Sequence, residues 1–597
     1  MRPLTVALAQ FRPAKGRPAD NLDLIERCFR DNSAVEVPAD VLVFPEAILT
    51  GYFLEGGVRE KAMTAGELYD LLADRHAKSG AGAVEACIGF YELHESRLYN
   101  SVMWASLGGS DAGIRHVHRK VFLPTYGVFD EERFVESGRD VRAFDTRIGR
   151  VAMLVCEDAW HSLLPTIAAV DGAQLVAIVA ASPARGLVPD STHPGQPGSQ
   201  ARWERLAREI AGEHGVYVAL SQLVGFEGGK GFPGGSLLVA PDGEVLLRAP
   251  QFEDALLGAT VDLDAITRVR ADAPLLADLE VKLPYLIESL DRARQRRESA
   301  TLPIEAGEWT PRIERADNGA APMAVVPQLE IDPELTSRWL VEFLRDEVRR
   351  LRRFENVIIG LSGGVDSAVV AFLAAQALGP ERVLAVRMPY KNSSPQSLEH
   401  ARLVVEATGI VERTVDITAA VDGYAAACGV AMTPERLGNV MARSRMITLF
   451  DLSAALGALP IGTGNKSERL LGYFTWHADD TPPVNPIGDL FKTQVWALAR
   501  HIGVPSVIVD KPASADLVAD QTDERDFGIT YARADGILDL VLKGHSQATL
   551  LASGYTADEI ATVRRRLDGT HWKRRLPSTA MLSGTAIGEY YLRPVDY

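Results

Sequence analysis

The chain has 597 residues, which is more than one hydrophobic core usually accommodates, so two or three domains are expected. Apolar residues make up 47% and charged residues 24%, as in an ordinary globular enzyme, and no apolar run approaches the roughly 20 residues that span a bilayer. The formal net charge of -16 argues against a nucleic-acid-binding surface. The four cysteines lack the pattern of a disulfide scaffold or a zinc site.

The N-terminal sequence MRPLTVALAQF lacks a basic region, an apolar stretch and a small-residue cleavage site. A secretory signal peptide requires these three features in that order. We therefore expect a cytoplasmic protein without a membrane partner.

The first part of the chain alternates between strand-like and helix-like segments. A helical spacing of apolar residues occurs around Leu22, Ile25 and Phe29. Short apolar runs that predict strands follow the order TVALAQF, DVLVFPE, EACIGFYEL, VAMLVCEDAW, AQLVAIVAAS, GVYVALSQLVG and SLLVAPDGEVLL. Many strands with helices between them predict an α/β sandwich that ends near residue 270.

The composition changes after this region. A charged, helix-like stretch, YLIESLDRARQRRES, leads into a segment that is rich in Pro, Gly and Ala and has little periodicity. We interpret residues 269–330 as a linker between an N-terminal domain, residues 1–268, and a C-terminal domain, residues 331–597.

The C-terminal domain begins with a helical pattern at Leu335. The apolar runs VIIGL, VLAVRMP, RTVDIT and LPIGTG then alternate with helical segments, among them AVVAFLAAQAL and MARSRMITLFDLSAAL. Strands that alternate with helices in this way predict a doubly wound parallel sheet.

The loop SGGVDS lies between the first predicted strand of this sheet and a helix, where phosphates are often bound. Glycines let main-chain N–H groups approach phosphate oxygens, and serine hydroxyls add donors. The residues concerned are Gly360, Ser362, Gly363, Gly364, Asp366 and Ser367. No GK[ST] follows, so the loop is not a Walker A motif. It resembles the loop of the pyrophosphatase-loop ATP-dependent synthetases, which cleave ATP between the α and β phosphates and adenylate an oxygen.

Further motifs select one branch of that superfamily. GNVMARSRM, GTGNKSERLLGYFT, NPIGDLFKTQVWALA, KPASADL and DQTDE follow in this order, and together they resemble NAD+ synthetases over roughly residues 335 to 597. The resemblance implies an ATP-pyrophosphatase fold, with Ser514 in a loop that closes over the nucleotide. The contacts implied are Thr463 and Lys492 with ATP, Asp366 and Glu468 with Mg²⁺, and Asn439, Arg443, Glu468, Asp479 and Lys511 with deamido-NAD+.

A candidate nucleophile lies in the N-terminal domain. VAMLVCEDAW places Cys156 at the end of an apolar strand, where a sharp turn would expose its sulfur. A free thiol has a pKa of about 8.5, so it needs help to react at neutral pH. A cysteine at such a place is more often a small buried hydrophobic residue, and Cys156 alone does not decide between the two interpretations.

Two other motifs support the functional interpretation. Glu46 ends a predicted strand in VLVFPEAILTGY, and HRKVFLPTYGVFDEERF supplies Lys120 and Glu131. Together with Cys156 they resemble the nitrilase-type carbon–nitrogen hydrolases, a family with a Glu–Lys–Cys triad and an αββα sandwich. The resemblance implies Glu46 as the general base, Lys120 as the stabiliser of the oxyanion, and glutamine contacts from Tyr126, Glu131 and Ser182.

The two resemblances imply an enzyme that releases ammonia from glutamine at one site and uses it at the other to amidate an adenylated deamido-NAD+. Its small-molecule partners would be glutamine, ATP and deamido-NAD+, and a homo-oligomer is expected. Two alternatives remain: an amidotransferase that acts on another carboxylate, and an ammonia-dependent synthetase whose N-terminal domain is an inactive scaffold. Intact Glu46, Lys120 and Cys156 argue against the second.

Overall fold

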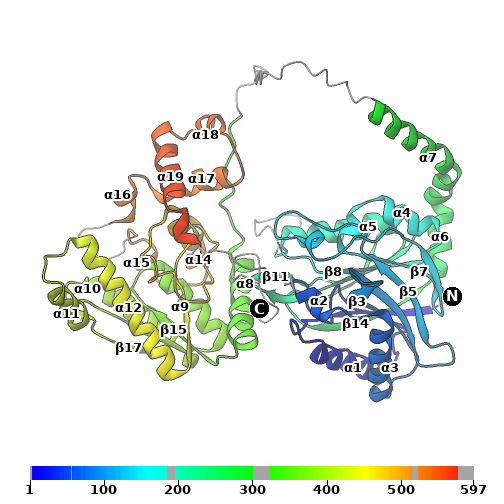
Figure 1. Ribbon diagram of the computed structural model, residues 1–597, viewed down its shortest axis with the longest axis horizontal. Coiled ribbons are helices and arrows are strands. Elements are labelled where there is room, and N and C mark those ends of the chain that lie inside the picture. The colour runs from blue at the N-terminus through cyan, green and yellow to red at the C-terminus, as the bar shows by residue number, and fades with distance from the viewer. Residues whose placement is uncertain (1–2, 55–56, 185–194, 300–322, 514–521, 576–597) are drawn as a thin grey trace. The chain divides into compact units, whose positions relative to one another are not determined.

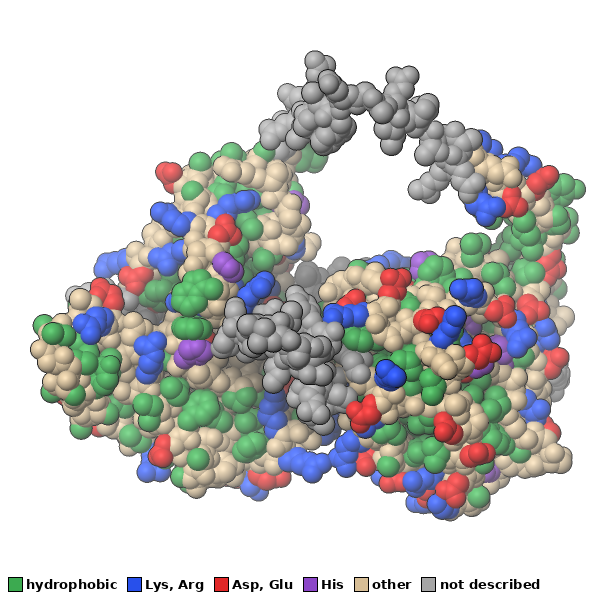
Figure 2. All heavy atoms as spheres, in the orientation of Figure 1, with side chains coloured by type: hydrophobic (Ala, Val, Ile, Leu, Met, Phe, Trp, Pro, Cys, Tyr) green, Lys and Arg blue, Asp and Glu red, His purple; other side chains and the backbone are tan. Residues whose placement is uncertain are grey.

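A computed structural model describes residues 3–54, 57–184, 195–299, 323–513 and 522–575. The chain divides into two compact units, one formed mainly by residues before 300 and the other mainly by residues after 322 (Figure 1). On the face drawn in Figure 2, acidic and basic side chains are interspersed over both units. Within the described residues, no helix has both the length and the apolar character that crossing a membrane requires.

The first unit contains two six-stranded sheets. In the first sheet the strand order is β14-β1-β2-β3-β4-β5. Its strands are β1 (Pro3–Gln10), β2 (Val41–Val43), β3 (Val84–His94), β4 (Arg97–Leu107), β5 (Gly113–Arg119) and β14 (Ala255–Asp262). Strands β1, β2 and β3 are mutually parallel, and the other pairs are antiparallel. Helices α1 (Pro18–Ala34) and α3 (Ala65–Ser79) cover one face, where Phe29 and Leu72 are fully buried.

The second sheet has the order β13-β12-β9-β8-β7-β6. Its strands are β6 (Ala143–Thr146), β7 (Gly149–Val155), β8 (Leu175–Ala180), β9 (Tyr217–Gln222), β12 (Leu237–Val239) and β13 (Val245–Arg248). The apolar sides of α4 (Leu163–Val170) and α5 (Gly198–His214) pack on this sheet. The hairpin predicted in SLLVAPDGEVLL is present, because β12 and β13 pair antiparallel. Strands β10 (Val224–Glu227) and β11 (Lys230–Pro233) form a separate hairpin.

The inner faces of the two sheets share one hydrophobic core. Val6 and Trp104 of the first sheet belong to the same buried cluster as Met153, Val176 and Val218 of the second. Side chains alternate between the two faces of a strand, so one face of each sheet fills this core while the other meets helices. The predicted αββα sandwich is confirmed.

Helices continue beyond the sandwich. Helix α6 (Asp264–Asp272) is followed by α7 (Leu275–Ser299), which contains the charged stretch YLIESLDRARQRRES (Figure 1). Residues 300–322 of the predicted linker lie outside the described part of the chain. The predicted domain boundaries at residues 268 and 330 stay predictions.

The sheet of the second unit has four parallel strands in the order β17-β16-β15-β18. The strands are β15 (Asn356–Gly360), β16 (Val383–Arg387), β17 (Val411–Thr414) and β18 (Ala458–Ile461). Val357 and Ile359 pack with the helices of one face, whereas Ile358 packs with Leu452 on the other. The direction of winding reverses between β15 and β18, so the doubly wound parallel sheet is confirmed and its switch point lies beside SGGVDS.

One predicted strand is displaced. The sequence RTVDIT predicts a strand over residues 413–418, but β17 ends at Thr414 and helix α11 begins at Thr418. The Asp416 carboxylate accepts a hydrogen bond of 2.7 Å from the Thr418 main-chain N–H. Aspartate commonly stabilises a turn in this way, which ends the extended conformation.

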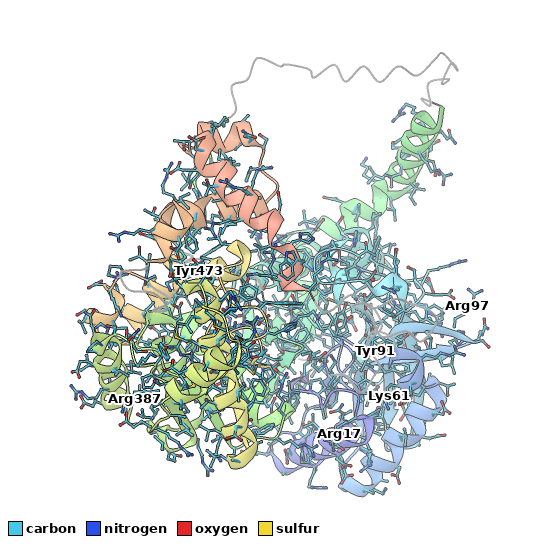
Figure 3. All side chains as sticks on the ribbon, turned by 60° about the vertical axis from the view of Figure 1, so that its left-hand side comes forward. Arg17, Lys61, Tyr91, Arg97, Arg387 and Tyr473 are labelled. Carbon is cyan, nitrogen blue, oxygen red and sulfur yellow. The ribbon has the colours of Figure 1, made fainter. Side chains whose placement is uncertain are left out.

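Helices surround this sheet and form a bundle after it. They are α8 (Pro333–Arg345), α9 (Val365–Leu378), α10 (Pro395–Thr408), α11 (Thr418–Ala427), α12 (Pro434–Leu456), α13 (Lys466–Leu471), α14 (Lys492–His501), α15 (Ser506–Val509), α16 (Asp523–Phe527), α17 (Tyr531–Leu542), α18 (Gln547–Ala552) and α19 (Ala557–Gly569). The C-terminal helices enclose Tyr531, which is fully buried. Tyr473, labelled in Figure 3, packs edge-on against Phe527 of this bundle.

Candidate active sites

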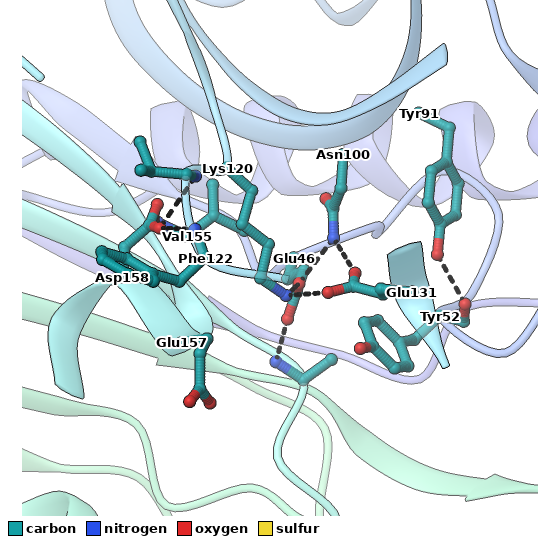
Figure 4. A network of polar contacts seen from close by, with 12 residues as sticks. Glu46, Tyr52, Tyr91, Asn100, Lys120, Phe122, Glu131, Val155, Glu157 and Asp158 are labelled. Atoms are coloured by element: carbon teal, nitrogen blue, oxygen red, sulfur yellow. Dashed lines mark hydrogen bonds and ion pairs between the residues drawn. The ribbon is translucent and has the colours of Figure 1, made fainter. Parts of the chain in front are cut away.

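A buried cluster of charged side chains lies in the first unit (Figure 4). Glu46 follows β2, Lys120 follows β5, and Glu131 begins the short helix Glu131–Arg133. The Lys120 ammonium is 2.9 Å from Glu46 Oε1 and 2.6 Å from Glu131 Oε2. Glu46 and Lys120 are inaccessible to solvent. The structure therefore brings together three predicted residues that lie far apart in the sequence.

The charges of this cluster are interdependent. Burial disfavours the Lys120 ammonium, but the charges of Glu131 and Glu46 outweigh burial and raise the pKa of Lys120. Burial also raises the pKa of Glu46 to about 6, although Lys120 opposes the rise. At neutral pH Glu46 is therefore mainly an anion, with a proton affinity higher than that of an exposed glutamate.

Cys156 lies at the turn between β7 and the short helix η3 (Cys156–Trp160). Its φ of 48° is left-handed, a conformation that residues other than glycine rarely adopt outside functional turns. Burial and the charge of Glu46 raise the pKa of the thiol well above its usual value, while Lys120 and the Ala181 main-chain N–H act in the opposite direction. Cys156 therefore rests as a thiol and needs a base to become nucleophilic.

Asp158, which sequence reasoning missed, connects this turn to the segment that carries Lys120. Its carboxylate is fully buried and has four polar neighbours. These are Nε2 of His118 at 2.9 Å and the main-chain N–H groups of Val121 at 2.9 Å, Phe122 at 2.9 Å and Val155 at 3.1 Å. The only sequence signal was an acidic residue two positions after the candidate nucleophile.

We expect Asp158→Ala to lower the rate of glutamine hydrolysis by about 100-fold, because a small misplacement of Cys156 relative to Lys120 costs this much. The loss of the buried acceptor should also destabilise the first unit by about 3 kcal/mol. Glutamate release and thermal unfolding would measure the two effects. The control is Asp145→Ala, since that side chain is 84% exposed and pairs with Arg150 at 3.2 Å. If the two variants behaved alike, Asp158 would have no positioning role.

The predicted glutamine contacts surround the same centre. The Tyr126 hydroxyl donates a hydrogen bond of 2.8 Å to Glu157, the residue after the nucleophile. Ser182 follows Ala181, whose N–H donates to Glu46 Oε2 over 2.8 Å. Glu131 also lines a cavity of about 150 Å³, together with Tyr52, Tyr91 and Phe129. Glu131 therefore belongs both to the charged cluster and to the wall of this cavity.

A second site lies at the switch point of the parallel sheet, where β15 leads into SGGVDS. Gly363 has a φ of 81°, and a Cβ there would lie 2.1 Å from the Ser397 main-chain oxygen, so only glycine fits. The Ser362 hydroxyl accepts a hydrogen bond from the Gly364 N–H over 3.2 Å. Ser367 donates to the Gly364 oxygen over 3.1 Å. The loop is thereby fixed at the N-terminus of α9, where an anion is favoured.

Three charged residues meet beside this loop. Lys492, almost fully buried, forms an ion pair with Asp366 and lies 3.5 Å from Glu468 Oε1. Burial opposes the Lys492 charge, but Asp366 and Glu468 outweigh it and raise its pKa. Burial and repulsion by Asp366 raise the pKa of Glu468 to about 8. Among the described residues, His, Cys, Asp and Glu form no group of three or more that could hold a metal ion.

Helices α13 and α14 carry Glu468 and Lys492, and a buried aspartate that the motifs did not suggest joins them. Asp535 of α17 accepts a hydrogen bond of 2.5 Å from the Ser467 hydroxyl and one of 3.0 Å from the Thr493 main-chain N–H. Thr463 follows β18, the parallel neighbour of β15. The glycine loop and Thr463 therefore both lie at the carboxyl ends of neighbouring parallel strands.

The residues predicted to contact deamido-NAD+ fall into two places. Arg443 donates to the Trp476 main-chain oxygen over 3.1 Å, and Asn439 accepts a hydrogen bond of 3.1 Å from Thr475. Asp479 accepts one of 2.8 Å from the Thr475 main-chain N–H. These three residues thus meet at the loop after α13.

Lys511 does not join them. Its ammonium donates to Ser397 Oγ over 3.1 Å, and the main chain of Ser397 contacts Gly363. Lys511 therefore lies near the glycine loop. Ser514 lies outside the described residues. Sequence reasoning also missed Lys573, which donates to the Phe474 oxygen over 3.1 Å beside the group of three.

Comparisons with known proteins agree with this division. A family model described as carbon-nitrogen hydrolase matches residues 5–271, and one described as NAD synthase matches residues 336–577. An NH(3)-dependent NAD(+) synthetase of Trichlorobacter lovleyi is 46% identical over 261 residues, which are 44% of this chain and 95% of that protein. The corresponding enzyme of Fusobacterium nucleatum is 43% identical, over 43% of this chain and 98% of its own.

Two solved structures share the fold over nearly the whole chain. A glutamine-dependent NAD+ synthetase from Acinetobacter baumannii has a TM-score of 0.69 at 24% identity, covering 100% of this chain and 98% of its own. One from Cytophaga hutchinsonii has a TM-score of 0.67 at 16% identity, covering 96% and 93%. The match to the curated relatives extends over almost their full length. The chain therefore belongs to the NAD synthase family, and a carbon–nitrogen hydrolase domain precedes the synthase domain on the same polypeptide.

Proposed function

We propose that the protein is a glutamine-hydrolysing NAD+ synthase. It hydrolyses glutamine in the first unit and uses ATP to convert deamido-NAD+ into NAD+ in the second. The observation that carries the proposal is the buried contact of Lys120 with Glu46 and Glu131 beside the strained Cys156 turn, in a chain that also carries the synthase domain. Burying three ionisable groups costs desolvation free energy, and such groups are typical of functional sites, so their presence argues against an inactive scaffold.

In the glutaminase reaction, Glu46 accepts the thiol proton of Cys156, and the thiolate attacks the side-chain amide carbon of glutamine. Lys120 and the main-chain N–H that follows the nucleophile stabilise the developing oxyanion. The proton held by Glu46 passes to the leaving nitrogen, which departs as ammonia and leaves a thioester. Water, deprotonated by Glu46, then releases glutamate and restores the thiol.

In the synthase reaction, the nicotinate carboxylate of deamido-NAD+ attacks the α-phosphorus of ATP, and pyrophosphate leaves. Ammonia then attacks the carbonyl carbon of the adenylate, which gives NAD+ and AMP. The loop at Ser362–Ser367 and the Lys492 ammonium would hold the phosphates. Asn439, Arg443 and Asp479 would bind deamido-NAD+, while Lys511 is closer to the phosphate loop.

The residues present suit a magnesium ion. Asp366 and Glu468 would hold it with hard oxygen ligands, and a bound cation would favour the ionised form of Glu468, whose pKa is raised by burial and by Asp366. When bound with ATP, Mg²⁺ would offset the negative charge of the phosphates, which would provide its remaining ligands. We also propose a cytoplasmic location and a homo-oligomeric state.

The direct test uses the purified protein with deamido-NAD+, ATP, Mg²⁺ and glutamine. We expect NAD+, AMP, pyrophosphate and glutamate, with glutamate at least equal to NAD+. If neither glutamine nor an ammonium salt supported NAD+ formation, the proposal would be wrong. Glutamine- and ATP-dependent AMP release with another carboxylic acid, but not with deamido-NAD+, would instead identify an amidotransferase for a different acceptor.

The pKa of Glu46 leads to a pH prediction. Glutamine hydrolysis should decline as the pH falls through about 6, because protonated Glu46 cannot accept the thiol proton. Glutamate release over a pH series, at saturating and at low glutamine, would measure the acid limb. A limb near pH 4, as expected for an exposed glutamate at about 4.3, would contradict the assignment of Glu46 as the base.

A further inference from the structure

A fully buried asparagine contacts both carboxylates of the charged cluster in the first unit. Asn100 lies on β4, and its side-chain nitrogen is 2.7 Å from Glu46 Oε1 and 2.7 Å from Glu131 Oε1. Its main-chain oxygen accepts a hydrogen bond of 2.9 Å from the Lys120 N–H. Asn100 therefore contacts every charged member of the cluster (Figure 4).

The orientation of the amide follows from these contacts. The Asn100 Oδ1 atom is buried and has no hydrogen-bond partner among the described residues. A flipped amide would place this oxygen against two carboxylates, so only the observed orientation is favourable. The amide gives up one possible hydrogen bond in order to make two with anions, which are the stronger kind.

Two buried carboxylates that share one ammonium carry a net negative charge. The Lys120 ammonium can neutralise only one of the two carboxylates, so without a further donor Glu46 and Glu131 would compete for Lys120. The two N–H groups of Asn100 supply one donor to each carboxylate. This keeps Glu46 and Glu131 apart and holds each on its own side of Lys120.

We propose that Asn100 is a positioning residue for the glutaminase reaction, which aims Glu46 and keeps it ionised by donating hydrogen bonds to Glu46 and Glu131 together. This inference rests on the proposed function, because it concerns the activation of Cys156 for attack on glutamine.

The electrostatic surroundings of Glu46 agree with this role. The titratable groups that interact with Glu46 are Lys120 and Glu131 of the cluster and, beside it, Cys156, Tyr52 and Tyr91. Burial raises the pKa of Glu46, Glu131 raises it further, and the hydrogen bond from Asn100 lowers it alongside Lys120. Without Asn100, only Lys120 and the Ala181 main-chain N–H would remain to oppose burial and the charge of Glu131, which both favour the protonated form of Glu46.

The test compares Asn100→Asp with Asn100→Leu. Both side chains are close in size to asparagine, but neither can donate two N–H groups, and aspartate adds a negative charge. We expect each variant to lose at least about tenfold in kcat/KM for glutamine, with the acid limb moved upward by about one pH unit. Ammonia-driven NAD+ formation should stay within about twofold of the wild type.

Ser106→Ala is a matched control, since Ser106 is also buried on β4 and donates to a buried carboxylate, Glu85, over 2.8 Å. It should leave the acid limb in place. If Asn100→Leu does not fold, Asn100→Asp decides the question. A wild-type acid limb in Asn100→Asp would overturn the inference, while the absence of glutamine hydrolysis in the wild type would overturn the proposed function itself.

Discussion

Cys156→Ala should abolish glutamine-driven NAD+ formation and leave ammonia-driven formation intact. The thiol is the only group at the turn after β7 that can form the thioester, and loss of a covalent nucleophile typically costs more than about a thousandfold. Glu46, Lys120, Glu131 and Ala181, which influence the pKa of Cys156, all belong to the first unit. With an ammonium salt in place of glutamine, we therefore expect a rate within about twofold of the wild type. NAD+ formation with each nitrogen donor measures both effects.

A second buried cysteine provides the control. Cys28 of α1 is also buried, and burial, with a smaller contribution from Asp31, raises its pKa to about 12. Cys28→Ala should retain both activities, because its thiol only fills space in the core. Equal use of glutamine by Cys156→Ala and the wild type would contradict the role of the thiol, and would favour an ammonia-dependent enzyme with an inactive N-terminal domain.

Sequence reasoning found the triad because its members lie at strand ends that carry strong patterns. Cys156 directly follows the apolar strand β7, and Glu46 lies three residues after the end of β2. Asn100 and Asp158 act differently. They link segments that are distant in the sequence, and a polar residue inside β4 or after Cys156 has no periodic signal that separates a functional contact from a structural one.

The second unit shows the same limit. The phosphate loop could be located because the alternation of strands and helices predicts both the parallel sheet and its switch point. Motif order grouped Lys511 with Arg443, but the contacts of Lys511 depend on how a loop folds back toward Ser397. Asp535 lies in α17, in a bundle that the sheet pattern does not predict, so its hydrogen bonds to Ser467 and Thr493 could not be anticipated.

Asp366→Ala should abolish NAD+ formation with glutamine and with ammonia alike. Asp366 pairs with the buried Lys492 and accepts a hydrogen bond of 3.0 Å from Asn465, so its carboxylate holds together the side chains that would meet the phosphates. Adenylation precedes the use of ammonia, and either nitrogen donor therefore depends on it. We expect a loss of at least about a thousandfold in AMP release, since the variant removes a proposed magnesium ligand and the ion-pair partner of Lys492.

The matched control for this variant is Asp489→Ala, because the Asp489 side chain is 95% exposed and forms a surface pair with Lys466 at 2.8 Å. Exposed pairs contribute little, so this variant should keep nearly full activity with both donors. Cys156→Ala in the first unit and Asp366→Ala in the second are expected to have different effects. Cys156→Ala removes one nitrogen source, whereas Asp366→Ala removes the acceptor for both. Ammonia-driven AMP release by Asp366→Ala at the wild-type rate would show that adenylation does not depend on the Asp366–Lys492 pair. The site of adenylation would then lie elsewhere.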